Sequence, residues 1–308
     1  MAEPGEVSRF VGYAASLRQL IADELSAPGI ASPPTFRSRR LDTTLPPVLL
    51  FSPHPDDESI TGLLPLRLLE EEGRRVINVA LTLGSQPDRR EARAAELTQA
   101  CDILGFELER SKAGCDAPER LKSFARQGDK ERDGLVESIL RVLVRHQPAL
   151  VVYPHGRDRH PAHEGASRLL ERALRLFSKQ GGTIAAVETE CWQPQPRVNL
   201  IVEGSDAQVG RLCQAIRAHH GEVSRNPYHV RQPIRMLENG FRASELVGGF
   251  GNRALPVAYC ELYALFRYRN GRKRRSPQQR FCSQTASLSL DRLLAESFGG
   301  GGAKREVL

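Results

Sequence analysis

The sequence predicts an α/β fold, a three-layer, Rossmann-like domain with a mainly parallel central sheet. Five short apolar runs bounded by turn signals have the pattern of strands buried on both faces, at residues 47–52, 75–83, 149–154, 183–188 and 198–203. Between most of them, apolar residues recur at three- and four-residue intervals, as in helices, at residues 63–72, 89–104, 134–146 and 163–179. Strands and helices that alternate in this way form parallel sheets through right-handed crossovers.

The segment before the first strand is amphipathic at residues 10–25, FVGYAASLRQLIADEL, and then rich in Pro and Ser at residues 26–40. We expect residues 1–45 to form a capping helix and a linker. The main domain, residues 46–270, begins with the strand PVLLFS. The helix after it stops at Gly73, and the helix after RVINVALTL stops at Gly105, since glycine favours the left-handed conformation that ends a helix.

The second half of the main domain repeats this arrangement around the strands ALVVYP, TIAAVE and VNLIVE. No GxGxxG motif follows any strand, so we do not expect a bound dinucleotide. The segment 254–268, ALPVAYCELYALFRY, indicates one further strand. Residues 271–308 are basic, then Ser-containing, then Gly-rich, and we expect this tail to be partly disordered, either from about Ser283 or from the Gly run at 299–302 onward.

Composition restricts the class of protein. Of the 308 residues, 40% are apolar and 26% charged, a globular balance, and no stretch approaches the roughly 18 apolar residues of a membrane span. The start, MAEPGEVSRF, has none of the features of a signal peptide, so we expect a cytoplasmic protein. The net charge of +7 owes much to the run 267–275, but no recognised motif accompanies it, so nucleic acid is not an expected partner. The six widely spaced cysteines are expected to be buried thiols.

The first cluster with chemical potential is PHPDDE, residues 53–58, directly after the first strand. It crowds one imidazole and three carboxylates into six residues. Carboxylates this close repel one another unless a cation or hydrogen-bond donors offset their charge. The alternative is a solvated acidic turn, but such turns do not usually follow a buried strand, so the cluster indicates a metal site or a strongly shifted proton equilibrium.

The second cluster, residues 153–164 (YPHGRDRHPAHE), follows the strand ALVVYP and leads into the next helix. It contains three histidines, at 155, 160 and 163. A single histidine is most often a packing or surface residue, but three together after a strand favour a site. In a doubly wound sheet the ends of adjacent strands lie about 5 Å apart, so the two loops can supply ligands to one ion. Two histidines and a carboxylate leave positions open, as in a catalytic zinc site.

The two motifs together resemble those of the PIG-L/LmbE family of zinc-dependent N-deacetylases. They are HPDDE at 54–58 and DRHPAH at 158–163, supported by RAAEL at 93–97 with LG at 104–105. The resemblance covers roughly residues 48–220, with a weaker match around Glu261, and implies an LmbE-like fold and removal of an N-acetyl group from a sugar conjugate, such as an N-acetylglucosamine derivative. It also implies a Zn²⁺ cofactor, with another divalent transition metal as the alternative.

Carried over position by position, the resemblance implies that His54, Asp57 and His163 bind the metal. Asp56 is then the general base and His160 stabilises the oxyanion. The remaining expected roles are contact with substrate for Arg93, Asp158 and His220, and support of the ligands for Glu58 and Glu164. Each has a simpler interpretation, since Arg- and Glu-rich helices are commonly solvated faces and histidines after a helix commonly lie on the surface. Trp192, after TIAAVE, is expected to pack, with stacking on a sugar ring as the alternative.

One position departs from the family pattern. Ala162 stands between the two histidines of the second motif, where the family usually has Asp. If that Asp orients or charges His160, its absence lowers the pKa of the imidazole, and Glu164 or Asp158 is the candidate substitute.

Two other functions are compatible with the residues. Adjacent aspartates after a strand also hold Mg²⁺ in phosphohydrolases, although the histidines favour zinc and no phosphate-binding Gly-rich loop is present. A non-catalytic member of the fold that binds anions through its basic surface is the other alternative, and the intact set of ligands argues against it. The sequence predicts neither the oligomeric state nor the identity of the substrate.

Overall fold

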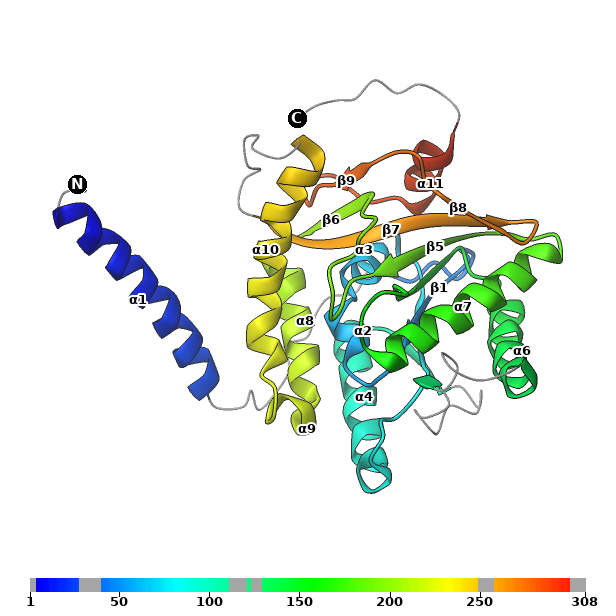
Figure 1. Cartoon of the computed structure of the whole chain (residues 1–308), viewed down its shortest axis with the longest axis horizontal. Coiled ribbons are helices and arrows are strands. Elements are labelled where there is room, and N and C mark those ends of the chain that lie inside the picture. Colours follow the sequence, from blue (N-terminus) through cyan, green and yellow to red (C-terminus); the bar gives the residue numbers. More distant parts are fainter. Residues whose placement is uncertain (1–3, 28–39, 111–120, 123–128, 249–257, 300–308) are drawn as a thin grey trace.

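The computed structural model describes residues 4–27, 40–110, 121–122, 129–248 and 258–299. Within them, nine strands form one mixed sheet flanked by helices (Figure 1). The strand order is β3-β2-β1-β4-β5-β7-β6-β9, and β8 also pairs with β7. The three-layer α/β class with a mainly parallel sheet is therefore confirmed.

The parallel part of the sheet consists of four of the five core strands that the sequence predicts, together with one that it does not; the fifth, at residues 198–203, lies in the antiparallel part. It comprises β1 (Val48–Ser52), β2 (Val76–Ala80), β3 (Glu107–Arg110), β4 (Leu150–Pro154) and β5 (Thr183–Thr189). Strands β1, β2 and β4 are buried along their whole length, as expected when helices cover both faces of a sheet. β3 carries charged residues and lies at the edge of the sheet.

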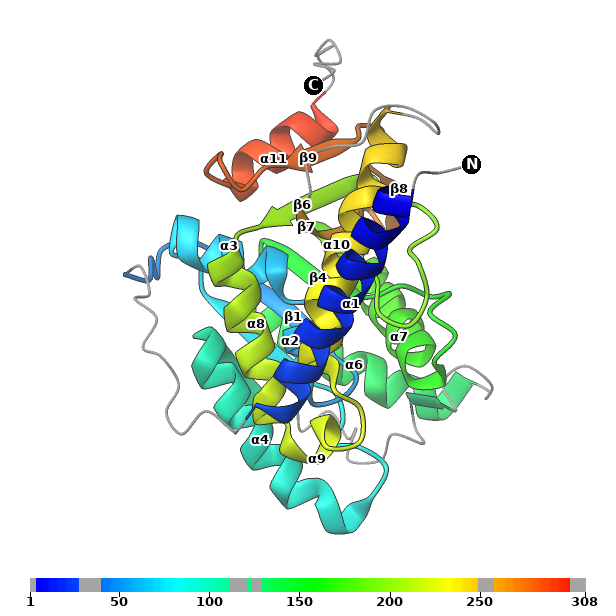
Figure 2. The ribbon, with the colours of Figure 1, turned by 90° about the vertical axis from the view of Figure 1, so that its left-hand side faces the viewer.

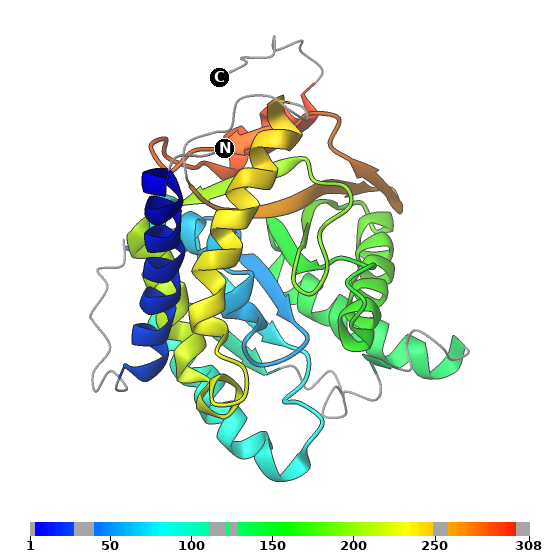
Figure 3. The same ribbon diagram turned by 60° about the vertical axis from the view of Figure 1, so that its left-hand side comes forward.

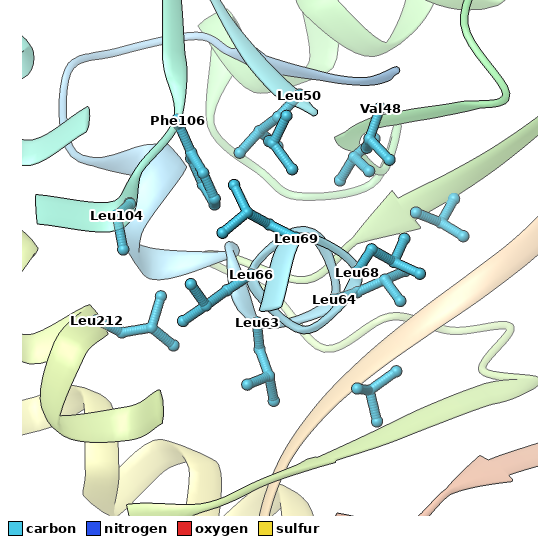
Figure 4. Packing of buried hydrophobic residues seen from close by; sticks show 14 of the residues in the cluster. Val48, Leu50, Leu63, Leu64, Leu66, Leu68, Leu69, Leu104, Phe106 and Leu212 are labelled. Carbon is cyan, nitrogen blue, oxygen red and sulfur yellow. The ribbon is translucent and has the colours of Figure 1, made fainter. Parts of the chain in front are cut away.

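Each face of the sheet has its own apolar core, because neighbouring residues of a strand point to opposite faces. Val48 and Leu50 face one core, in which the leucines of one helix pack against β1 and two further helices (Figure 4). Leu49 and Phe51 face the other core. The first core is covered by α3 (Leu63–Glu72), α4 (Arg90–Leu104) and α8 (Asp206–Ala218), and the second by α6 (Asp129–His146) and α7 (Pro161–Lys179).

The four helices that the sequence predicts are present with small changes at their ends. α3 has the predicted bounds, and both it and α4 end at glycines in the left-handed conformation, Gly73 (φ 74°) and Gly105 (φ 72°). α7 begins two residues earlier than predicted, at Pro161, where the missing N–H of proline costs nothing.

The far side of the sheet is mainly antiparallel. The predicted further strand is β7 (Tyr259–Arg269), which pairs with β5 along residues 264–269 and with β6 (Leu200–Gly204) along residues 259–263. The short strands β8 (Arg272–Arg275) and β9 (Arg280–Cys282) extend this part. The basic run that begins at Arg267 is thus the hairpin of β7 and β8, not a solvated tail.

The expectation of disorder from Ser283 is wrong for residues 283–299. They include α11 (Leu290–Phe298), and Leu288, Leu290 and Leu293 are buried in the first core. The apolar residues of this amphipathic helix pack on the first core. A prediction of disorder from Ser and Gly content does not consider such packing. The rest of the expected disorder falls on residues 300–308, outside the described residues.

Two helices run along one side of the domain (Figures 2 and 3). α10 (Tyr228–Gly248) packs against β7 and α8, although the sequence offered no assignment for residues 225–252. α1 (Pro4–Ser26), the predicted N-terminal helix, lies outside it with few contacts and exposes Val11, Tyr13 and Leu20. The predicted linker falls largely on residues 28–39, outside the described residues. Among the described helices, none is both long and apolar enough to cross a membrane.

Candidate metal centre

The two motif loops emerge at the point where the order of the parallel strands reverses. β1 pairs with β2 on one side and with β4 on the other, so the loops after β1 and β4 leave the same edge of the sheet side by side. Such a switch point opens a crevice at the carboxyl ends of the strands, where open α/β sheets bind ligands. The loop after β1 and the start of the short helix that follows it carry PHPDDE, and the loop after β4 with the first turn of α7 carries the three histidines.

The backbone at Asp56 is strained where the first loop becomes α2 (Asp57–Ile60). Asp56 has φ 121°, in a region that side chains other than glycine rarely adopt. Its N–H donates to Glu58 Oε2 at 2.9 Å, and its carbonyl accepts hydrogen bonds from the N–H groups of Ser59 and Ile60. Strain of this kind persists only where the surroundings over-determine the conformation, as in functional sites.

Three potential ligand atoms form a nearly equilateral triangle in the crevice. Nδ1 of His54 lies 3.3 Å from Oδ2 of Asp57, and Nε2 of His163 lies 3.4 Å from that oxygen and 3.3 Å from the His54 nitrogen. A tetrahedral zinc ion with bonds of about 2.0–2.1 Å holds its ligand atoms about 3.3–3.4 Å apart. The spacing and the donor types of these three residues therefore fit zinc.

The second ring nitrogen of His163 is held by a carboxylate. Nδ1 lies 2.7 Å from Oδ2 of Asp158, which directs Nε2 toward the triangle. Burial alone would lower the pKa of His163, but the carboxylates of Asp57 and Asp158 outweigh it and raise this pKa to about 10 in the metal-free structure. Burial likewise opposes ionisation of Asp158, but hydrogen bonds from His155 and His163 lower its pKa to about 2. The two groups form a buried ion pair.

His160 lies against the triangle, with its ring centroid 4.9 Å from those of His54 and His163. Burial and the two neighbouring histidines lower its pKa to about 4, which favours the neutral imidazole. This is the direction expected from Ala162, although burial is the largest cause. Ala162 itself is fully buried in the second apolar core.

Asp56 lies beside the triangle with only 8% of its surface exposed. Burial and the neighbouring charge of Asp57 raise the pKa of its carboxyl well above the usual range. Within the described part of the chain, no hydrogen bond reaches this carboxylate. A buried carboxyl with a raised pKa and no engaged partner suits a group that takes up and gives back a proton.

This geometry can be set beside known proteins. Residues 49–174 match the family model described as PIG-L: GlcNAc-PI de-N-acetylase. These residues form a PIG-L family domain. No curated protein sequence matches the chain.

Two solved structures resemble the fold of the PIG-L domain together with further parts of the chain. The GalB 4-carboxy-2-hydroxymuconate hydratase from Pseudomonas putida KT2440 is 21% identical and matches 70% of this chain and 95% of its own, with a TM-score of 0.54. The N,N'-diacetylchitobiose deacetylase from Pyrococcus horikoshii is 17% identical and matches 82% of this chain and 92% of its own, with a TM-score of 0.51. At these identities the likeness shows the fold, which is shared by a hydratase and a deacetylase.

The other predicted site residues of the PIG-L domain lie outside the triangle. Arg93 donates to the carbonyl of Pro55 at 3.0 Å and pairs with Glu222, so it holds the first loop. Glu58 is buried and lies 2.7 Å from Nε2 of His219. Glu164 is partly exposed in the first turn of α7.

His220, the third residue expected to contact substrate, is exposed and lines a different hollow. That hollow has a volume of about 350 Å³ and lies between the end of α1, α4, α8 and the start of α10. The structure therefore brings together His54, Asp56, Asp57, Asp158, His160 and His163, and leaves His220 apart from them.

Three residues near the site were not predicted to belong to it. Cys191 lies with Sγ 3.8 Å from Oδ1 of Asp57, Trp192 stacks on His160, and His219 pairs with Glu58. Cys191 and Trp192 follow β5, which pairs with β4. They therefore also lie beyond the carboxyl end of a parallel strand, where open α/β sheets bind ligands, and this position could have indicated them. His219 is the neighbour of His220, whose segment the sequence already offers as a candidate lining of the pocket, but its pairing with Glu58 could not be predicted because that partner lies 161 positions away.

Proposed function

We propose that the protein is a zinc-dependent hydrolase that removes the N-acetyl group from a sugar conjugate, such as an N-acetylglucosamine derivative. The observation that carries the proposal is the triangle of His54, Asp57 and His163, with the unengaged carboxylate of Asp56 beside it. The family description and the diacetylchitobiose deacetylase support this reaction, since both name removal of acetyl groups from sugars.

His54, Asp57 and His163 would hold the ion. Bound there, zinc supplies Lewis acidity that polarises the amide carbonyl and makes a water molecule easier to deprotonate. Asp158 fixes the tautomer of His163 through Nδ1, so that a lone pair on Nε2 faces the triangle.

Asp56 takes the proton from the attacking water and later gives it to the departing amine. Its raised pKa suits both steps, because a carboxyl that titrates nearer neutral pH both accepts and releases a proton more readily. His160 donates a hydrogen bond to the oxygen of the amide as negative charge develops there. Since its lowered pKa favours the neutral imidazole, we assign this role to an N–H group of the neutral ring.

Removal of metal tests the proposal. We expect chelation to abolish release of acetate from N-acetylglucosamine conjugates, and added zinc to restore it. His54→Ala and Asp57→Ala should lose both bound zinc and activity, because each removes one corner of the triangle. Asp56→Asn should keep zinc and lose activity by a factor of about 10² or more.

The same assay separates the alternatives. Phosphorylated sugars are supplied beside N-acetylated ones, and release of phosphate without acetate would identify a phosphohydrolase. Zinc retained by both the His54 and the Asp57 variants would contradict the ligand assignment. Purified protein that holds no zinc and hydrolyses neither substrate would favour a non-catalytic member of the fold.

A further inference from the structure

Beside the triangle, two aromatic side chains from different elements, Trp192 and Tyr228, lie nearly at right angles to each other and form what we call the aromatic corner. Trp192, after β5, stacks on His160 with ring centroids 5.8 Å apart and planes 20° apart. Tyr228, at the start of α10, stands at 80° to Trp192 with centroids 6.1 Å apart. Trp192 remains 46% exposed, so much of the indole surface is open to a ligand. An indole used only for packing would be more deeply buried.

The aromatic corner is held in place by polar contacts. Oδ1 of Asp158 accepts hydrogen bonds from the backbone N–H groups of Trp192 and Gln193, at 2.7 and 2.8 Å. The other oxygen of this carboxylate holds His163. The guanidinium of Arg231 lies over the ring of Tyr228, 5.5 Å from its centroid. The position of Trp192 is therefore tied to that of the metal-binding histidine by one buried side chain.

The distances suit a ring that is attached to the amide under attack. His160 lies between Trp192 and the triangle, with centroids 5.8 Å from the first and 4.9 Å from His54. In an N-acetylated sugar, the ring carbon that carries nitrogen is two bonds, about 2.5 Å, from the carbonyl carbon. A pyranose whose amide lies at the triangle and against His160 has its ring within reach of the indole.

We propose that Trp192 and Tyr228 bind the pyranose ring of the substrate, with Trp192 as the stacking surface. The inference rests on the proposed deacetylation and deepens it, because it assigns the preference for a sugar over other N-acetyl amines to these two side chains. The C–H groups on one face of a pyranose are apolar and pack on an aromatic plane, and the contact removes water from both surfaces.

Trp192 is the only tryptophan of the chain, so its fluorescence reports on this surface alone. The zinc-loaded full-length protein is titrated with methyl N-acetyl-β-glucosaminide and, in parallel, with N-acetylethanolamine, an acyclic acetamide. We expect a saturable change in emission with the sugar and none with the acyclic amide at equal concentration. Phe241→Ala is the matched control, since Phe241 is 52% exposed and lies about 20 Å farther along α10 than Tyr228, and its titration should equal that of the wild type.

Kinetics give the second measurement. We expect Trp192→Ala and Tyr228→Ala to raise KM for the sugar about tenfold, and Trp192→Phe to raise it less, while bound zinc is unchanged in all three. A change in kcat alone, or an equal loss with sugar and acyclic substrates, would assign Trp192 a structural role and overturn the inference.

The two proposals fail separately. If the sugar causes a saturable change in emission but no acetate is released, the proposed sugar-binding surface is supported and the proposed deacetylase activity is wrong. Acetate release without any emission change, or with equal KM for wild type and Trp192→Ala, would overturn the binding surface alone. Absence of an emission change at every sugar concentration overturns the inference whether or not acetate is released.

Discussion

Asp158 joins His163 of the triangle to the loop after β5 through its two carboxylate oxygens. One oxygen lies 2.7 Å from Nδ1 of His163 and the other accepts from two backbone N–H groups. The side chain is fully buried, so the pairing is shielded from solvent. The residue was expected to contact substrate; in the structure both of its carboxylate oxygens are engaged within the protein, and we propose that it orients His163 as a ligand.

Replacing this carboxylate should weaken the site. We expect Asp158→Asn to reduce the affinity for zinc about 10- to 100-fold, because an amide holds the histidine less firmly than a carboxylate does. Competition with a chromogenic chelator measures the affinity. Asp102→Asn is the control, since Asp102 is exposed on α4, and equal affinities of the two variants would argue against the role of Asp158.

His163 makes the stability of the metal-free protein depend on pH. Its pKa is raised to about 10 in the folded state, against about 6.5 for an unperturbed histidine. A raised pKa means that the folded state holds the proton more tightly, so this group stabilises the protein below pH 6.5 and loses that effect as pH rises toward 10. Urea denaturation of wild type and His163→Gln at pH 6, 8 and 10 measures the free energy of unfolding. We expect the difference in this free energy between the two proteins to shrink with rising pH. A constant difference would contradict the raised pKa.

At the scale of elements, glycines in α7 and α8 show how packing overrides helix propensity. Gly165, the fifth residue of α7, lies so close to Leu121 that an added Cβ would stand 1.9 Å from the backbone carbonyl oxygen of Leu121. Gly210, the fifth residue of α8, has nothing within 4 Å of that position. Alanine favours helix over glycine by about 1 kcal/mol at either site, so any difference between them comes from the neighbour.

The two substitutions should therefore act in opposite directions. We expect Gly210→Ala to raise the free energy of unfolding by about 0.5–1 kcal/mol and Gly165→Ala to lower it by about 1–3 kcal/mol, because a backbone atom must move to make room. Chemical denaturation of both variants beside the wild type measures the effect. If both substitutions stabilise the protein by similar amounts, the backbone of Leu121 moves away from α7 at little cost in free energy, and the expected clash is absent.

The elements also show where prediction from sequence stops. α3 and α4 were predictable because their apolar spacing and their terminal glycines agree. α10 was not, because its segment contains Pro233 and two glycines, which normally mark loops. It is helical because Met236 and Gln232 are buried against the domain, with the side-chain amide of Gln232 donating to the carbonyl of Ile60 at 2.7 Å. Tertiary contacts outweigh local preference there.

At the scale of the whole molecule, the last ordered segment closes the first core. Arg67 of α3 is fully buried, and its guanidinium donates to the carbonyls of Cys282, Ser283 and Ala286. Without these acceptors, the buried cation would lose three of the six hydrogen bonds that it makes within the described residues and keep only those to Glu71 and Glu203. The segment that the sequence presents as a tail is therefore part of the main domain, and we propose that this domain extends to about residue 298.

Truncation tests that boundary. We expect a chain that ends at residue 270 to lose at least about 3 kcal/mol of stability, because it loses the buried Leu290 and Leu293 and three of the four carbonyl acceptors of Arg67. A chain that ends at residue 299 is the control and should unfold at the same temperature as the full-length protein in calorimetry. Equal melting temperatures for both truncations would restore the interpretation of residues 271–308 as a tail.

The sequence by itself determined four of the five parallel strands, the helices with clear apolar spacing and the residues of both motifs, because each of these depends on neighbours within a few positions. Only the tertiary structure decided that β4 lies beside β1, which places His163 within 3.4 Å of Asp57, 106 positions away. It also decided the antiparallel pairing of β7 and the positions of Trp192 and His219. Strand order and contacts between distant segments follow from burial of the whole chain, and no local pattern records them.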